Sequence, residues 1–187
     1  MKMRTIAIAS LAMALAVSTA RADTLSIPIT NATVIDTVTD SGPTYRLLLS
    51  FDVPQVLQGK SIEFAHLIMD NPVSESGPTI TVQAFPLTTQ WDPATVSWTF
   101  PWRRHPGGDF DSTIHYRFRI GPQDQFRLFL DLTRFVTGWA SGRPNYGILL
   151  KRPDYEDRGF GRETRRLRIL ASQARIKVYY SRSDSMP

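Results

Sequence analysis

The sequence predicts an all-β protein, an antiparallel jelly-roll-like β-sandwich with one short helix. Apolar and polar residues alternate along several short segments, as in strands that bury only one face. Turn signals built from Gly, Pro and Asn separate these segments, while helical periodicity is confined to one short stretch. Many short strands at regular spacing with little helix are typical of sandwiches joined by Greek-key connections.

The expected strands are short and spread over most of the chain. They lie at 45–53, 61–69, 80–84, 116–120, 126–130, 148–150 and 174–180. In one of them, Tyr116, Phe118 and Ile120 alternate with two arginines. Turn signals fall at 41–43, 71–72, 76–78, 106–108, 121–122 and 158–161. The sequence shows no internal repeat, so we expect a single domain.

The short helix is expected directly after the strand at 126–130. Asp131 and Thr133 carry side-chain oxygens that accept hydrogen bonds from the free N–H groups of a first helical turn. Phe135, Val136 and Trp139 then share one face of the helix. A helix this short buries its tryptophan only by lying across a sheet, so Trp139 is an expected core residue.

The end of this helix is also marked in the sequence. Gly142 is able to adopt the left-handed conformation that ends a helix, and Pro144 prevents its continuation. Asn145, Tyr146 and Gly147 then form a turn signal before the apolar segment 148–150. These residues are therefore expected to be scaffold.

The segment from the Asp-x-Thr pair to the Asn-Tyr-Gly turn resembles the signature of the DNRLRE domain, a secreted β-sandwich family. Further motifs lie on either side of it in family order. An Arg-Leu-Leu-x-Phe-Asp strand and a Thr-Val-x-Trp run precede it, and an Arg-Glu pair and a closing strand follow it, so the resemblance spans residues 26–180. Ser50 stands where the family has a second arginine. The resemblance implies the same sandwich, with a structural signature formed by Arg46, Asp52, Trp98, Asp131, Thr133, Trp139, Asn145, Tyr146, Gly147 and Glu163.

The N-terminus has the pattern of a signal peptide. Lys2 and Arg4 precede an apolar stretch at 6–17, and Ala20-Arg21-Ala22 has the small-x-small form of a cleavage site. No later segment reaches the ~20 consecutive apolar residues of a membrane helix. We expect cleavage after Ala22, a secreted or periplasmic location, a sandwich domain at 23–180, a loose tail at 181–187 and no membrane span.

The charge balance argues against nucleic acid as a partner. The whole chain has 22 basic and 17 acidic residues. Loss of Lys2, Arg4 and Arg21 with the signal peptide leaves 19 basic residues and a net charge of +2. The basic residues near 151–168 alternate with acids, which is typical of a solvated face. The chain also has no cysteine, so its core has to hold the fold without disulfides.

Residues suited to catalysis or metal binding are few. His105 and His115 flank a loop with Asp109 and Asp111, but the spacing matches no standard zinc or EF-hand pattern. We therefore expect no bound metal. If one binds, Asp109 and Asp111 are the candidate ligands, and calcium is the cofactor that stays possible. The sequence has no nucleophile elbow, and the acids at 154–163 lie in a loop rich in Gly and Arg, where charge pairing is the simpler explanation. We expect no enzymatic activity.

Aromatic residues indicate where a ligand would bind. Trp98 and Trp139 have the parity of core residues, whereas Trp91, Trp102 and Tyr155 are expected to be freer. Trp102 stands beside two arginines and a Pro-Gly-Gly loop, which suits an acidic saccharide. The candidate ligand-binding residues are Trp102, Arg103, Arg104, Trp91 and Tyr155.

Two function classes and a minor third follow. The first is an exported, non-catalytic binding module that recognises polysaccharide or a cell-envelope or extracellular-matrix component; the resemblance supports it, since some DNRLRE-like domains are carbohydrate-binding modules. The second is a structural or adhesion protein that self-associates or packs on a surface partner. The third is a small polysaccharide-active enzyme, for which a small sandwich offers little cleft depth.

Overall fold

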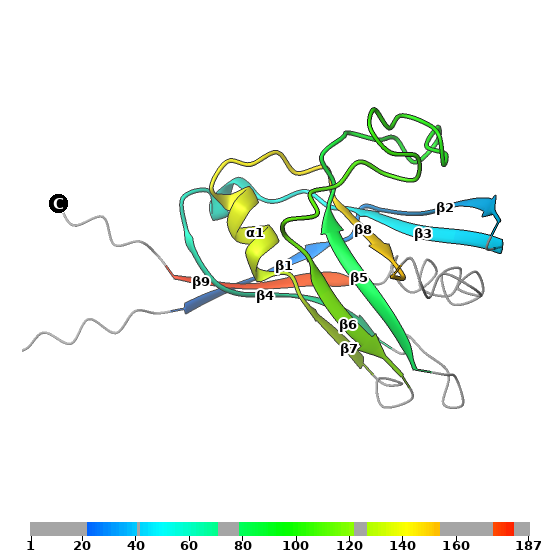
Figure 1. Cartoon of the computed structure of the whole chain (residues 1–187). Helices are drawn as coiled ribbons and strands as arrows, with labels where there is room; N and C mark the ends of the chain where they lie inside the picture. The colour runs from blue at the N-terminus through cyan, green and yellow to red at the C-terminus, as the bar shows by residue number, and fades with distance from the viewer. Residues whose placement is uncertain (1–21, 41, 71–78, 122–126, 154–173, 182–187) are drawn as a thin grey trace, which may run out of the picture.

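The computed structural model of the 187-residue chain describes residues 22–40, 42–70, 79–121, 127–153 and 174–181. These residues form an antiparallel β-sandwich with one short helix, which confirms the expected fold class (Figure 1). The strands are β1 (Ala22–Pro28), β2 (Asn31–Thr39), β3 (Gly42–Ser50), β4 (Ser61–Asp70), β5 (Ile80–Pro86), β6 (Tyr116–Ile120), β7 (Arg127–Asp131), β8 (Ile148–Lys151) and β9 (Arg175–Ser181). The helices are a 3-10 turn, η1 (Gln55–Leu57), and α1 (Thr133–Ala140).

The strand order is that of a jelly roll with one added strand. One sheet has the order β1-β9-β4-β7 and the other has the order β2-β3-β8-β5-β6. Without β2, successive strands alternate between the sheets except at the β5–β6 pair, which gives the two Greek keys of a jelly roll. The added β2 pairs with β3 along its whole length, from Asn31 opposite Ser50 to Thr39 opposite Gly42.

The main core lies between the two sheets. The alternation seen in the sequence fixes which residues enter it: in β9, Ile176 and Val178 are buried while their neighbours are partly exposed. In β3, Leu47 and Leu49 also point inward and are fully buried. Burial of such side chains at about 25 cal/mol per Å² of apolar surface is the main stabilising term for a chain without disulfides.

The helix α1 packs over one end of this core. Trp139 is 4% exposed and meets Phe51 edge-on at a centroid distance of 5.1 Å. The helix ends in a Schellman motif, because the N–H groups of Gly142 and Arg143 donate to the carbonyls of Trp139 and Gly138, and Gly142 has a φ of +92°. The expectations of a buried tryptophan and a glycine stop are thus confirmed.

A second apolar cluster lies on the outer face of the five-stranded sheet. Its buried residues are Ile35, Leu48, Phe85, Leu87 and Leu149. The long segment between β5 and β6, residues 87–115, folds back over them and brings several aromatic rings into contact with the cluster. All four residues of β8 are buried because this strand is covered on both faces.

Several local expectations were wrong or incomplete. The strands β1 and β2 were not predicted from alternation. Lys151, interpreted as part of a solvated basic face, is only 6% exposed and lies over the rings of Phe85 and Phe110. Among the described residues, no helix is long and apolar enough to cross a membrane.

Candidate functional site

The segment 87–115 is organised around the carboxylate of Asp109. This side chain is 2% exposed and accepts hydrogen bonds from the backbone N–H groups of Arg103, Arg104 and His105 at 2.7, 2.9 and 2.9 Å. The hydroxyl of Thr89 donates a fourth, at 2.9 Å. Burial raises the pKa of Asp109, but these donors outweigh it and lower the pKa from 3.8 to about 2. Asp109 is therefore a charged anchor that fixes residues 103–105.

Two glycines allow the segment to lie close to the sheet. Gly107 and Gly108 are buried and have positive φ values of 84° and 133°. A Cβ on Gly107 would lie 2.5 Å from the guanidinium of Arg46 and 2.8 Å from the ring of Trp98. The Arg46 guanidinium lies 4.6 Å from the centroid of Trp98 and donates to the carbonyl of Pro106. The Pro-Gly-Gly sequence is thus a close-packed element here, whereas the sequence alone suggested a flexible loop.

The three tryptophans of this segment have similar environments. Trp91, Trp98 and Trp102 are all half-buried and pack against the outer cluster. The indole N–H of Trp91 donates to the carbonyl of Tyr146, and that of Trp102 donates to the carbonyl of Ser97, both at 2.9 Å. The expected contrast between a core Trp98 and a freer Trp91 and Trp102 is wrong, because all three rings are half-buried against the same cluster.

The start of α1 is held from three directions. Asp131 accepts the N–H of Thr133 at 2.8 Å and the hydroxyl of the same residue at 2.6 Å. The Thr133 hydroxyl oxygen accepts the N–H of Ala65 in β4, so it ties the helix to the sheet instead of capping a helical N–H. The N–H of Arg134 donates to the hydroxyl of Tyr116 in β6 at 2.9 Å. Burial raises the pKa of Tyr116 above its ordinary value of 10.0.

The turn after α1 is equally well anchored. The side-chain amide of Asn145 donates to the carbonyl of Phe51 at 2.6 Å, and its oxygen accepts the N–H of Gly147. Gly147 has a φ of +89°, and a Cβ there would collide with the carbonyl oxygen of Leu49. The Asp-x-Thr and Asn-Tyr-Gly motifs are therefore scaffold, as expected, and they fix α1 against the end of the sandwich.

A pocket of about 190 Å³ lies between α1 and the end of the 87–115 segment. We call it the α1 pocket. Its base includes Leu87, Phe135 and Trp139, and its rim carries Asp111, Arg134 and Arg143. The Arg143 side chain crosses Gly138 of the helix, where an added Cβ would lie 3.2 Å from its Cδ. The hydrogen bond from Thr113 is the main cause that lowers the pKa of Asp111, and the charge of Arg143 also lowers it.

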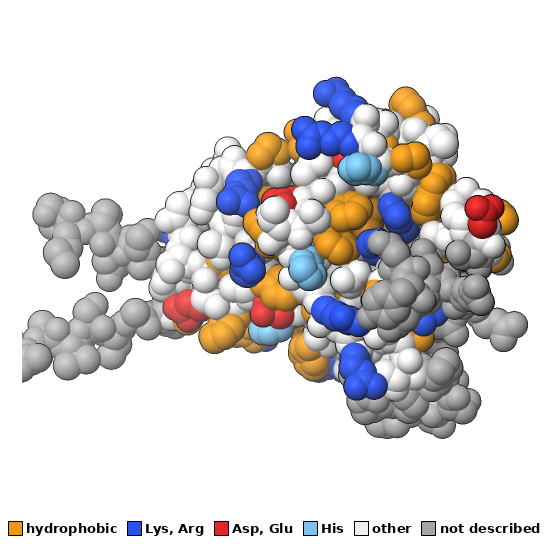
Figure 2. Space-filling view, viewed as in Figure 1, with side chains coloured by type: hydrophobic (Ala, Val, Ile, Leu, Met, Phe, Trp, Pro, Cys, Tyr) orange, Lys and Arg blue, Asp and Glu red, His pale blue; other side chains and the backbone are white. Residues whose placement is uncertain are grey.

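A second, more polar pocket adjoins the first. This loop pocket has a volume of about 580 Å³, and its lining includes Arg103, Arg104, His105 and Thr89. Thr88 and Asp111 line both pockets, so the two are neighbours, and we call them together the arginine groove. Lys and Arg side chains are prominent around α1 and over the 87–115 segment in Figure 2. Small-molecule sites usually measure ~300–1,000 Å³, so the α1 pocket alone suits one sugar ring at most and the whole groove suits several.

The groove contains part of the predicted site. Arg103 and Arg104 line it, and their side chains are exposed. Trp91 and Trp102 are not among its lining residues, and Tyr155 and Glu163 lie outside the described residues. Arg134 and Arg143 were missed, since only the helix and its turn place them beside the loop. Of the remaining signature residues, Asp52 is exposed.

The two aspartates in the described part of the groove are held by local hydrogen bonds. All four hydrogen bonds to Asp109 use its two carboxylate oxygens, and Asp111 turns one oxygen toward Thr113. Within the described residues, no three His, Cys, Asp or Glu side chains gather as a metal site would require. Asp109 and Asp111 are therefore explained by local structure.

No model of a known protein family matches this sequence, and a search of curated proteins gives no match.

Proposed function

We propose that this chain is an exported, non-catalytic binding domain that recognises an anionic polysaccharide through the arginine groove. The observation that carries the proposal is the placement of four arginines along one groove with an apolar base. Arg134 and Arg143 border the α1 pocket, and Arg103 and Arg104 border the loop pocket. The proposed relation to the DNRLRE domain agrees with this reading, because the motif residues that are described serve as scaffold around the groove.

The chemistry of the groove suits an acidic sugar. A guanidinium binds a carboxylate or sulfate through two parallel N–H donors, and such charge-assisted bonds are stronger than neutral ones. The apolar base accepts the C–H face of a sugar ring, while Thr88, Thr89 and Thr113 offer hydroxyls to its polar edge. A chain of acidic sugars would thus place successive negative charges along the arginines.

The proposal of a non-catalytic role rests on the carboxylates of the groove. Glycoside hydrolysis usually needs one carboxyl as acid and a second as nucleophile or base. Asp109 is buried under four hydrogen bonds with a pKa of about 2, so it is neither exposed to a substrate nor able to donate a proton near neutral pH. Asp111 is then the only carboxylate that lines the described groove and is not fully enclosed.

A second candidate function, self-assembly, is favoured by a different observation. β2 is the outermost strand of its sheet, and Val38 near its end is 80% exposed. An edge strand presents backbone N–H and C=O groups with which another chain is able to pair. Light scattering over a range of concentrations tests this candidate: assembly through β2 predicts a rise in mass that Val38→Lys abolishes, and a monomer at all concentrations contradicts it.

Titration calorimetry with hexagalacturonate tests the groove. We expect Arg134→Gln and Arg143→Gln each to weaken binding about tenfold, since one charge-assisted hydrogen bond contributes about 1.5 kcal/mol. Arg119→Gln removes the same charge from an exposed position on β6 and serves as the matched control. Equal affinities for the groove variants and this control would contradict the proposal, as would equal binding of neutral maltohexaose.

A further inference from the structure

The outer face of the four-stranded sheet carries exposed aromatic rings, which is unusual for a sandwich. Outward residues of a sandwich strand are ordinarily polar. Here Phe64 of β4 and Phe129 of β7 are 58% and 56% exposed. The ring of Phe64 lies nearly parallel to that of His66, with centroids 6.4 Å apart. Tyr179 of β9 adds a third ring to the same face.

A pocket of about 340 Å³ is set into this face. We call it the sheet-face pocket. It is bordered by His66, Phe129 and Tyr179 and by three cationic side chains, Arg127, Arg175 and Lys177. Its volume falls within the ~300–1,000 Å³ that is usual for small-molecule sites. The pocket therefore combines ring faces with positive charge, as the arginine groove does.

The arginines of this pocket already hold a carboxylate from the chain itself. Asp70 accepts a hydrogen bond from Arg127 at 2.6 Å and lies 3.6 Å from a guanidinium nitrogen of Arg175. Lys177 lies over Tyr179, with its ammonium 5.0 Å from the ring centroid. The three cations outnumber Asp70, so the pocket keeps a net positive charge. Asp131, which faces His66 across the β4–β7 pair, directs its oxygen to Thr133.

This charge decides which occupant fits the face. A symmetric dimer through the same surface would bring two copies of a positively charged patch together, and like charges at close range are destabilising. A uronate supplies the opposite charge in the same carboxylate form that Asp70 already presents to the two arginines. The ring faces of Phe129 and Phe64 then suit the C–H surface of the sugars.

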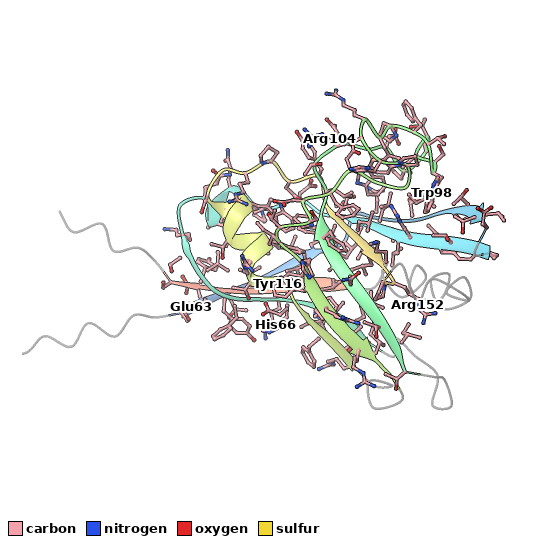
Figure 3. The ribbon with its side chains drawn as sticks, in the orientation of Figure 1. Glu63, His66, Trp98, Arg104, Tyr116 and Arg152 are labelled. Atoms are coloured by element: carbon pink, nitrogen blue, oxygen red, sulfur yellow. The ribbon has the colours of Figure 1, made fainter. Side chains whose placement is uncertain are left out.

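We infer that the sheet-face pocket is a second binding site for a polyuronate chain, so that one domain holds two polysaccharide chains together. The inference of bridging rests on the proposed function of the groove. The two sites lie on opposite sides of the sandwich: Figure 3 shows Arg104 on the 87–115 segment and His66 beyond the other sheet. A single chain has to wrap around the domain to occupy both, whereas two chains reach them directly and become cross-linked.

Calorimetry with hexagalacturonate and turbidity with polygalacturonate test the inference. The wild-type chain is expected to bind two hexamers. The double variant Phe129→Ala/Lys177→Gln is expected to bind one, through the groove, and to lose turbidity. The double variant Arg134→Gln/Arg143→Gln is expected to retain the other site and also to lose turbidity. Phe100→Ala/Lys60→Gln changes the same kinds of side chain at residues that line neither site and is expected to behave like the wild type.

The outcomes separate the two proposals. If the sheet-face variant keeps two sites and full turbidity, the inference is overturned while the groove stands. If the groove variant keeps two sites, the proposed function and the bridging both fail, whatever the sheet face binds. Tighter binding of a heparin hexasaccharide at the sheet face would overturn the assignment to uronate. Circular dichroism confirms that each variant is folded before it is scored.

Discussion

Replacement of Asp109 by Asn is expected to release the 87–115 segment from the sheet. The carboxylate has two oxygens, and both accept hydrogen bonds: one from Arg104 and His105, the other from Arg103 and Thr89. An asparagine keeps one oxygen and places an N–H₂ group where the other oxygen was. If the amide nitrogen replaces the first oxygen, the N–H groups of Arg104 and His105 face another donor. If it replaces the second, the N–H of Arg103 does so, while the Thr89 hydroxyl is able to turn and accept.

The expected loss is about 3 kcal/mol of unfolding free energy. A hydrogen bond to a charged group contributes roughly 1.5–3 kcal/mol, and in its favoured orientation the variant loses one such bond in a site that is 2% exposed. We take the upper value because the remaining bonds lose their charge assistance. The sign of the pH dependence follows from the lowered pKa. The wild-type advantage is fully present above pH 3.8 and is lost as the pH falls toward 2, where Asp109 is protonated.

Urea unfolding of the wild type and Asp109→Asn, followed by tryptophan fluorescence at several pH values, measures this loss. Amide hydrogen exchange reports directly on the N–H groups of residues 103–105, which are expected to exchange faster in the variant. Asp92→Asn alters an exposed carboxylate of the same segment, which accepts one N–H from Ala94, and is the matched control. A difference below about 0.5 kcal/mol between the two variants, with unchanged exchange at 103–105, would refute the anchoring role.

Three further predictions concern the helix and its turns. Gly147→Ala is expected to lower the free energy of unfolding by at least about 2 kcal/mol, because the new Cβ collides with Leu49 and the backbone conformation disfavours a side chain. Gly142→Ala meets open space and is expected to lower it by about 1 kcal/mol. Equal shifts in the thermal unfolding temperature of the two variants would contradict this. Tyr116→Phe leaves the N–H of Arg134 without its acceptor and is expected to cost about 1 kcal/mol in urea unfolding, and an unchanged midpoint would contradict it. Gly138→Ala is expected to raise the free energy of unfolding by about 0.5–1 kcal/mol, because alanine favours the helix more than glycine does. The new Cβ would displace the Arg143 side chain and weaken hexagalacturonate binding, so an unchanged affinity would show that the position of Arg143 is not needed.

The sequence predicted the structure best where the spacing of apolar residues and the turn-forming residues indicate the same element. Strict alternation predicted β6 and β9, and the burial of Ile176 and Val178 follows directly from it. The helix α1 was predictable because its start, its apolar face and its glycine stop occur within one short segment. β1 and β2 were harder to recognise because much of their surface is exposed, so their apolar pattern is weak.

The arrangement of the groove was beyond sequence reasoning for a physical reason. Asp109 satisfies backbone donors, and backbone N–H groups leave no trace in the residue pattern. Arg134 lies in the first turn of a helix that the sequence did predict, and Arg143 follows its end, but nothing local indicates that this helix lies beside Asp111. The roles of the tryptophans were predicted wrongly for the same reason. Only the folded sheet shows that Leu48 and Leu149 are apolar residues on its outer face, against which these rings pack.

Hydrogen-exchange mapping with and without saturating hexagalacturonate tests the central claim most directly, because it locates the bound sugar on the protein. Binding in the arginine groove predicts slower exchange at residues 103–105 and 134–143, with no change at the tip of the β2–β3 hairpin. Unchanged exchange in both groove segments at saturation, or protection confined to the hairpin, would contradict the account.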